Sequence, residues 1–315
     1  MFVDQSAPAG STTPDFRQLA EAIVHTVAYV DVFDYPLTAA EVHRYLKGVA
    51  APAGAVLDAL ANQQLVPRRL ARQGEYYMLP GREEIAAIRQ QRAARAAQLW
   101  PLALAYGRQI ARLPFVRMVA ITGSLAVNNV VKEADVDYLV VTETGRVWLT
   151  RAMTILLVRL AARRGVVLCP NYFLAAHALA FDNRSLYAAH ELVQMVPLSG
   201  ADVYAQLRQA NRWTEQFLPN AQGYPTPMPT SPLPGDDRAA RRLAERLLRT
   251  PAGEHLERWE MTRKITKFTR QSGDRGAAEA AFCADWCKGH FDDHGARAMA
   301  AFSQRVETLE QRREP

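Results

Sequence analysis

Cysteine is scarce in this chain, which has only three in 315 residues. Cys169, Cys283 and Cys287 are an odd-numbered set without the spacing of a disulfide framework, which argues for a reducing compartment. Long apolar runs are lacking too, because the most apolar stretch, 152–162, is too short to cross a membrane and contains Arg159. The first residues lack the basic and apolar segments of a signal peptide. We therefore expect a cytoplasmic protein without a membrane partner.

Charge of neither sign dominates the chain. Lys and Arg total 38, Asp and Glu total 32, and the net charge is +6 at pH 7. A mildly basic chain is compatible with a polyanionic partner such as a nucleotide or nucleic acid, but it does not require one. Hydrophobic residues make up 49% of the sequence, which is enough for packed cores, and the length predicts two or three domains.

The N-terminal part has the periodicity of three short helices. One apolar stripe marks the first helix, with members at three- and four-residue steps: Leu19, Ile23, Val27 and Val30. Thr38 and Glu41 have the spacing of a capping box, which predicts the start of a second helix. A third helix fits 53–64.

Two strand-like pieces, 65–70 and 76–79, follow these helices and are joined by a turn containing Gly74. Three helices followed by a hairpin are typical of a winged helix, which often binds DNA. The wing is basic, with Arg68, Arg69 and Arg72. The third helix, however, has no Arg or Lys to hold phosphates or read bases. The pattern therefore favours a winged helix that is inert or contacts protein, and leaves DNA binding weakly supported.

The most informative stretch lies near the middle of the chain. An apolar, β-branched run at 116–122 predicts a largely buried strand, and Gly123-Ser124 interrupts it. A short segment compatible with a helix, 125–131, precedes a second strand that begins at Asp135.

Asp135 and Asp137 point to a metal site at the start of this second strand. Residues two apart on a strand face the same way, so the two carboxylates lie side by side and repel each other. A divalent cation relieves this repulsion, and hard oxygen ligands favour Mg²⁺. Gly123 lets the backbone approach a ligand, and Ser124 with the neighbouring amides supplies donors to phosphate oxygens. The pattern is that of phosphoryl or nucleotidyl transfer.

The stretch resembles the signature of the nucleotidyltransferase superfamily, which has the polymerase-β-like fold. The resemblance covers about twenty residues and rests on Gly-Ser-x-Ala, matched by Gly123, Ser124 and Ala126, and on Asp-x-Asp, whose first member follows Gly123 by 12 positions. Two features depart from the family: Val127-Asn128 replaces a frequent Arg-Gly, and a third carboxylate on a later strand has no obvious match.

The resemblance implies a mixed sheet in an α/β core, Mg²⁺ or Mn²⁺ as cofactor, and a nucleoside triphosphate as substrate. Asp135 and Asp137 would be the catalytic and metal-binding residues, and Gly123 and Ser124 would hold the terminal phosphates. Basic groups near the start of the next helix, predicted at 146–164, meet nucleotide phosphates in related proteins, and Arg146 and Arg151 are the candidates here.

The third carboxylate would fall on the strand predicted at 165–175, where the residue available is Asn171. Asparagine can bind a metal through its carbonyl oxygen, but it cannot act as a general base. Asp182 and Glu191 are weak substitutes. Cys169 lies on the same strand face as Asn171, and we expect it to be a buried, inert thiol. His177 is expected to have a structural role. Four residues at helical spacing are candidates to line a cleft, although ordinary packing is favoured: Tyr187, His190, Glu191 and Gln194.

The C-terminal third is predicted to be helical after a proline-rich segment. Helices are expected at 238–249, 256–270, 277–288 and 296–313, the first two with a broad positive face. One set of side chains could bind zinc, namely Cys283, Cys287, His290 and His294, but the spacing is not one of the familiar zinc patterns, and packing is favoured.

The fold class expected is therefore an α/β, nucleotidyltransferase-like core with winged-helix-like and helical domains on either side. In chain order we expect a disordered tail (1–14), a winged-helix-like domain (15–81), a helical connector (82–113), the core (114–217), a proline-rich linker (218–237) and a helical domain (238–315).

Two classes of function follow. The first is transfer of a nucleoside monophosphate to the hydroxyl of an unidentified acceptor, which could be RNA, protein or a small molecule. The second is an inactive nucleotide-binding regulator whose winged helix contacts DNA or protein.

Overall fold

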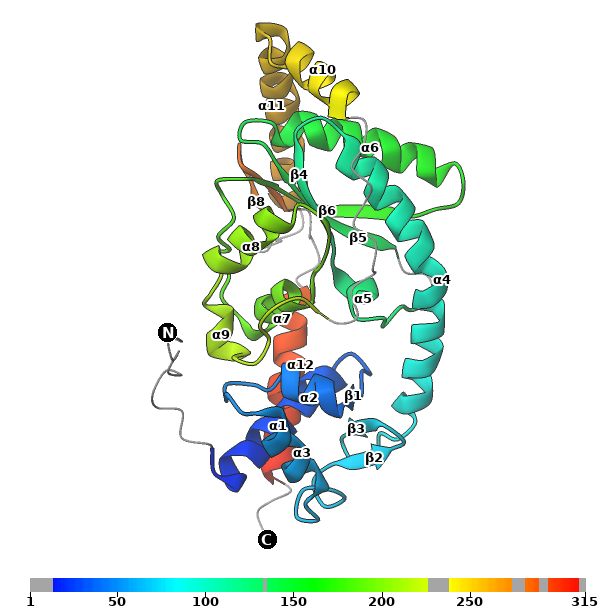
Figure 1. The fold of residues 1–315 in the computed structure, drawn as a ribbon, viewed down its shortest axis with the longest axis vertical. Coiled ribbons are helices and arrows are strands. Elements are labelled where there is room, and N and C mark those ends of the chain that lie inside the picture. The colour runs from blue at the N-terminus through cyan, green and yellow to red at the C-terminus, as the bar shows by residue number, and fades with distance from the viewer. Residues whose placement is uncertain (1–13, 133–134, 226–237, 274–280, 289–293, 312–315) are drawn as a thin grey trace, which may run out of the picture.

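The computed structural model describes residues 14–132, 135–225, 238–273, 281–288 and 294–311. Within these ranges the protein is a mixed α/β structure whose centre is a mixed β-sheet (Figure 1). The tail at 1–13 and residues 226–237 of the expected linker lie outside the described residues.

The N-terminal helices begin close to the expected positions. They are α1 (Phe16–Asp31), α2 (Ala39–Arg44) and α3 (Ala53–Ala61). The capping box is confirmed, since the Glu41 amide donates to Thr38 Oγ1 at 3.3 Å and the Thr38 amide donates to Glu41 Oε2 at 2.9 Å. A small antiparallel sheet follows, in the order β1 (Leu37–Thr38), β3 (Tyr76–Met78), β2 (Ala71–Gln73).

The strand expected at 65–70 is wrong, because these residues form hydrogen-bonded turns and β2 begins at Ala71. The Arg69 and Leu70 amides both donate to the Leu65 carbonyl, at 2.8 and 3.0 Å. Pro67 has no amide proton to give to a ladder, so the segment suits a turn better than a strand. The assignment of this region as a winged helix stays a prediction.

One long helix, α4 (Ile85–Arg112), joins this region to the central sheet (Figure 1). It corresponds to the connector expected from the sequence and runs through Pro101. Two of its arginines bind the N-terminal region: Arg89 Nη2 lies 2.7 Å from Glu41 Oε1, and Arg92 Nη2 lies 3.2 Å from Asp34 Oδ2.

The central sheet has the strand order β7-β4-β5-β6-β9-β8. Its strands are β4 (Val116–Ile121), β5 (Val136–Thr142), β6 (Leu168–Ala175), β7 (Val196–Ser199), β8 (Ala281–Phe282) and β9 (Trp286–Lys288). β5 and β6 are parallel and every other pair is antiparallel, so the sheet is mixed. The three strands predicted from the sequence are confirmed as β4, β5 and β6.

Helices cover both faces of the central sheet. α4, α6 (Val147–Ala162) and α11 (Pro251–Gly273) contribute to the core on the face of Val136, Tyr138 and Val140. The other face, that of Leu139 and Val141, shares its core with α1, α7 (Leu186–Gln194), α8 (Ala201–Ala210) and α12 (His294–Gln311). Short α9 (Thr214–Phe217) contacts α7, and α10 (Arg238–Leu248) precedes α11.

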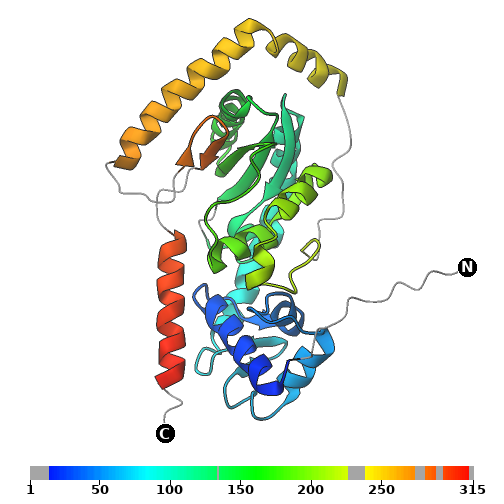
Figure 2. The ribbon, with the colours of Figure 1, turned by 90° about the vertical axis from the view of Figure 1, so that its left-hand side faces the viewer.

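The helix expected at 277–288 is wrong, because its described part forms the β8–β9 hairpin, which pairs with β6 (Figure 2). Its side chains alternate between the cores on the two faces of the sheet. Cys287 joins the core on the Val140 face, whereas Trp286 packs with Phe181 in the core on the Leu139 face. Aromatic side chains favour such half-buried strands. The C-terminal third is therefore not purely helical. β7 begins two residues after the end of α7, and the sequence did not predict it.

None of the helices in the described part of the chain combines the length and the apolar character needed to cross a membrane.

Asp31 connects α1 to two distant segments, and its loss tests how this packing is held. Its side chain is 5% exposed and accepts from Arg82 Nε at 3.0 Å and Arg305 Nε at 2.6 Å. Asp31→Ala leaves both guanidinium groups without this partner. Because the arginines are about a third exposed, we expect a loss of about 2 kcal/mol, below the 3–5 kcal/mol typical of fully buried pairs.

Urea unfolding of the full chain measures this loss. Glu215→Ala is the matched control, because the Glu215–Arg212 pair is exposed and its removal should cost less than about 1 kcal/mol. Equal losses in the two variants would contradict the assignment of Asp31 as the connecting residue.

Candidate functional site

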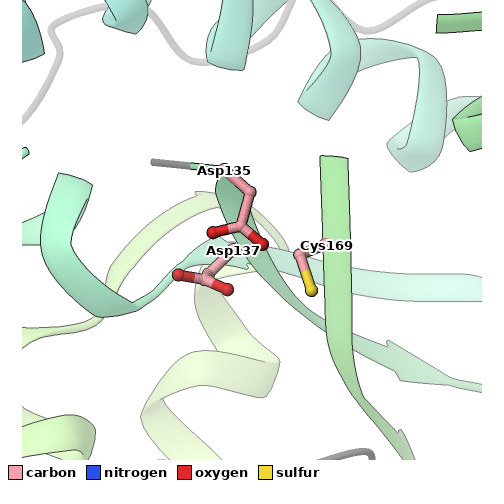
Figure 3. Close-up of side chains that lie close together, drawn as sticks. All are labelled: Asp135, Asp137 and Cys169. Atoms are coloured by element: carbon pink, nitrogen blue, oxygen red, sulfur yellow. The ribbon is translucent and has the colours of Figure 1, made fainter. Parts of the chain in front are cut away.

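Asp135 and Asp137 lie together at the start of β5, as the sequence predicts. Asp135 directly precedes the strand, and Asp137 lies on its Leu139 face. Figure 3 shows both carboxylates next to Cys169, which comes from the neighbouring strand β6. The carboxylate oxygens and the Cys169 sulfur lie within 4.8 Å of one another. Two strands therefore bring three possible metal-binding side chains to one point.

Gly123 packs directly against the Asp137 carboxylate. It follows β4, has a φ of 65° and begins the four-residue helix α5 (Gly123–Ala126). A Cβ atom at this position would lie 2.3 Å from Asp137 Oδ2, which leaves no room for any other side chain. The Thr122 amide donates to the Asp137 carbonyl at 3.1 Å, so the backbones are also tied together. The glycine is thus required both by its φ and by the close carboxylate.

Asn171 lies beside Asp137 because of an irregularity in the β5–β6 pairing. Tyr138 pairs with Pro170 and Leu139 with Tyr172, which leaves Asn171 as an extra residue on β6. Its Nδ2 donates to Asp137 Oδ1, and its Oδ1 accepts from Cys169 Sγ at 2.8 Å. Asn171, which occupies the expected position of a third carboxylate, therefore contacts Asp137 through its side-chain amide.

The electrostatics of this cluster favour an added positive charge. Burial, the nearby Asp135 carboxylate and that of Glu191 raise the pKa of Asp137 to about 8, while the hydrogen bond from Asn171 opposes this shift. Burial and both aspartates raise the pKa of the Cys169 thiol to about 12. No described Lys or Arg forms an ion pair with either aspartate. The donor set, two carboxylates with a thiol and an amide oxygen nearby, fits a divalent cation.

Arg146 and Arg151, the other predicted nucleotide-binding residues, are not brought to this cluster. They lie at the start of α6, which follows the far end of β5 and covers the opposite face of the sheet. The Arg146 guanidinium lies 5.1 Å from the centre of the Phe115 ring, and that of Arg151 lies 4.9 Å from the Phe268 ring. Their contacts are with the α11 side of the molecule.

The remaining candidates are dispersed. His177 lies 3.4 Å from Asp285 and 3.0 Å from Thr144, and Asp182 is exposed beyond the far end of β6. Cys287 is buried in the β8–β9 hairpin and Cys283 is exposed there. His290 lies outside the described residues, so the zinc set cannot be assembled from them.

A cavity of about 190 Å³ borders the cluster on the side of Gly123 and Ser124. α7 supplies the four residues that the sequence offered as cleft candidates, Tyr187, His190, Glu191 and Gln194. A second wall comes from α1 and the turn after it, through Tyr29, Val30, Phe33 and Tyr35. Sequence reasoning missed this wall, because its residues lie about a hundred positions from the Asp-x-Asp motif and belong to an ordinary apolar helix.

No protein-family model, curated protein or solved structure matches this chain.

Gly123→Ala tests the contact between the Gly123 backbone and the Asp137 carboxylate. Two penalties are expected: a left-handed φ for a residue with a Cβ, about 1–2 kcal/mol, and displacement of the Asp137 side chain. Gly74→Ala is the matched control, since Gly74 has a φ of 61° and no atom within 4 Å of its would-be Cβ.

Urea unfolding and Mn²⁺ binding measured on both variants separate the two penalties. Gly74→Ala should show the backbone penalty alone and bind Mn²⁺ as the parent chain does. Gly123→Ala should be less stable than Gly74→Ala and bind Mn²⁺ more weakly. Equal behaviour of the two variants would contradict the contact.

The raised pKa of Asp137 predicts how stability changes with pH in the metal-free protein. Because the folded chain keeps this carboxyl protonated up to about pH 8, the folded state binds more protons than the unfolded state between about pH 4 and pH 8. The contribution of the Asp137 carboxyl to the free energy of unfolding is therefore complete below about pH 4 and is lost as the pH rises to about 8. Asp137→Asn removes this loss, since its amide does not titrate.

Unfolding free energies in the presence of a chelator, taken at pH 5 and pH 8, check this expectation. From pH 5 to pH 8, Asp137→Asn should gain stability relative to the parent chain by an amount of the order of 1.4 kcal/mol per unit of pKa shift within that window. Asp58→Asn, at an exposed position on α3, should show no such gain. A gain equal in both variants would rule out Asp137 as the source.

Proposed function

We propose that the protein is a metal-dependent nucleotidyltransferase that moves a nucleoside monophosphate from a nucleoside triphosphate to an acceptor hydroxyl. The observation that carries this proposal is the packing of the Gly123-Ser124 corner against the Asp137 carboxylate, next to Asp135. Many proteins have two nearby acidic residues; here Gly123, which has a positive φ, also packs against one of the carboxylates.

Asp135 and Asp137 would hold Mg²⁺ or Mn²⁺, with Asn171 fixing the orientation of Asp137 through its amide. Bound there, the cation would supply activation of the acceptor hydroxyl and neutralisation of the triphosphate charge. Gly123 and Ser124 lie beside the carboxylates and are suited to the terminal phosphates, because no side chain of residue 123 blocks their approach. Arg146 and Arg151 take no part in this proposal.

One observation favours the second candidate, an inactive nucleotide-binding regulator. The side chain at the position of the third carboxylate is Asn171, which donates to Asp137 and cannot accept a proton from a hydroxyl. A DNA-contacting role gains no support from two of the three arginines of the expected wing, since Arg69 pairs with Glu21 at 2.8 Å and Arg72 donates to the Gly74 carbonyl at 2.9 Å.

Incubation with each labelled triphosphate, Mg²⁺ or Mn²⁺ and total cell extract tests the proposal. Label should arrive on an acceptor, and Asp135→Asn and Asp137→Asn should each reduce transfer by roughly a thousandfold, because metal binding is worth several kcal/mol of transition-state stabilisation. Asp58→Asn is the control and should transfer normally.

Retained transfer in either site variant would refute the site assignment. Nucleotide binding without transfer to any fraction of the extract would favour the regulator instead. The nature of the labelled fraction identifies the acceptor as RNA, protein or a small molecule.

A further inference from the structure

Three helices, α6, α10 and α11, form the end of the molecule that lies farthest from the N-terminal region (Figure 1). They are neighbours in space, since α11 contacts both α6 and α10. α6 and α11 pack on the Val140 face of the central sheet, whereas Asp137 lies on the Leu139 face. A partner bound at this end would therefore leave the candidate site uncovered.

Large hydrophobic side chains are exposed at this end more often than elsewhere. In the described part of the chain eleven large hydrophobic residues are exposed, and six of them belong to these three helices: Leu156, Leu160, Leu243, Leu247, Leu256 and Trp259. Leu243 and Leu247 are four positions apart, so they share one face of α10. Exposed apolar groups that gather in one region mark an interaction surface, whereas single ones need no explanation.

α10 and α11 bury glutamates where an ordinary amphipathic helix buries leucines. Glu245 accepts from the Phe115 amide at 2.9 Å, and Glu257 accepts from the Trp148 and Leu149 amides at 2.9 and 2.6 Å. With Glu260, these glutamates are each no more than 6% exposed. The acidic groups are therefore used inside the protein, and the leucines and most of the arginines remain outside.

The positive charge of the chain is concentrated in the same helices. Residues 147–164 and 238–273 contain 14 Lys or Arg and four Asp or Glu, whereas the whole chain has 38 and 32. These two segments therefore carry a net charge of +10, and the remainder of the chain carries −4. Such an asymmetric distribution directs a protein towards an anionic partner.

Several of these cations are available to a partner. Arg242, Arg246 and Arg258 are exposed, and none of them forms an ion pair with an acidic residue in the part of the chain that the structure describes. Arg242 and Arg246 lie one turn apart on α10, next to Leu243 and Leu247 in the sequence. Charged and apolar groups thus alternate along one exposed stretch of helix.

The combination of leucine and arginine selects among anionic partners. Nucleic acids pair arginine with aromatic side chains on which bases stack, but Trp259 is the single aromatic residue among the six exposed hydrophobic ones. A second copy of the chain would bring like charges together. A bilayer with anionic lipids offers headgroup charges for arginine and an apolar boundary beneath them for leucine and tryptophan.

We propose that the end formed by α6, α10 and α11 binds the surface of a bilayer that contains anionic lipids. Leu243, Leu247 and Trp259 enter the boundary between headgroups and acyl chains, and Arg242 and Arg246 pair with the headgroups. The sequence predicts no membrane partner because it has no segment that could cross a bilayer, but a helix that lies on the surface needs no such segment. The proposal does not depend on the proposed function.

Co-sedimentation of the full chain with vesicles tests the proposal. One set of vesicles contains phosphatidylcholine alone, and the other replaces about a third of it with phosphatidylserine. The chain should bind the mixed vesicles roughly a hundredfold more tightly, as three arginines near an anionic surface provide. Added salt should weaken this binding, because it screens the headgroup charge.

Two substitutions on α10 separate the apolar and the charged contributions. Leu247→Ser should weaken binding to the mixed vesicles about tenfold, because one leucine no longer leaves water. Arg242→Gln should weaken it about fivefold and leave binding to pure phosphatidylcholine unchanged.

The matched controls are Leu57→Ser on α3 and Arg17→Gln on α1, both at the opposite end of the molecule (Figure 1). Leu57 is 53% exposed and Leu247 is 64% exposed, so the two serine variants remove similar apolar groups. Neither control should change binding to either set of vesicles. Thermal unfolding of all four variants verifies that they fold.

Tryptophan fluorescence shows where the chain meets the bilayer. Mixed vesicles should shift the emission of the parent chain to shorter wavelength, and Trp259→Phe should lose most of this shift although four other tryptophans remain. A shift that persists in Trp259→Phe would place the contact elsewhere and overturn the proposal.

Equal binding to the two sets of vesicles, or an equal effect of Leu57→Ser and Leu247→Ser, would also overturn it. Single-stranded RNA that binds more tightly than the mixed vesicles, with no loss in Leu247→Ser, would identify a nucleic-acid surface instead. A dimer in sedimentation velocity that Leu247→Ser dissociates would identify a second copy as the occupant, and would likewise exclude the bilayer.

Discussion

A partly buried carboxylate with no positive partner among the described residues is the constraint on which the centre of this structure depends. Asp137 lies between Asp135, Cys169 and Asn171, and the first two offer it no stabilising charge. Burial of the Asp137 carboxyl on folding costs free energy at neutral pH, since the group must either stay protonated or be ionised beside other carboxylates. Strongly shifted carboxyl pKa values of this kind are typical of functional sites.

Much of this centre could be predicted from the sequence because it depends on local periodicity. The period of two in a strand places Asp135 and Asp137 on one face whatever the rest of the chain does. The apolar runs on either side of Gly123 predict the two strands, and the Thr38–Glu41 capping box predicts the start of α2. In each case the information lies within a few residues of the element it describes.

The features that were missed depend on contacts between distant segments. The β8–β9 hairpin was read as a helix because its pairing with β6, more than a hundred residues earlier, decides its conformation. The contact of Asn171 with Asp137 depends on one extra residue in β6, which no periodicity reveals. Tyr29 and Glu191 face the same cavity from helices over 150 positions apart, and each alone resembles ordinary packing. Local patterns therefore predict the acidic pair better than its surroundings.

The use of arginine in the N-terminal region bears on what that region does. Arg82 and Arg305 bind Asp31, and Arg89 and Arg92 are held by groups of the same region. These cations hold α1, α4 and α12 together. These arginines are therefore engaged in packing, and α1 also lines the cavity beside Gly123. The N-terminal region thus lies next to the candidate site, since residues of α1 line the same cavity as Gly123 and Ser124.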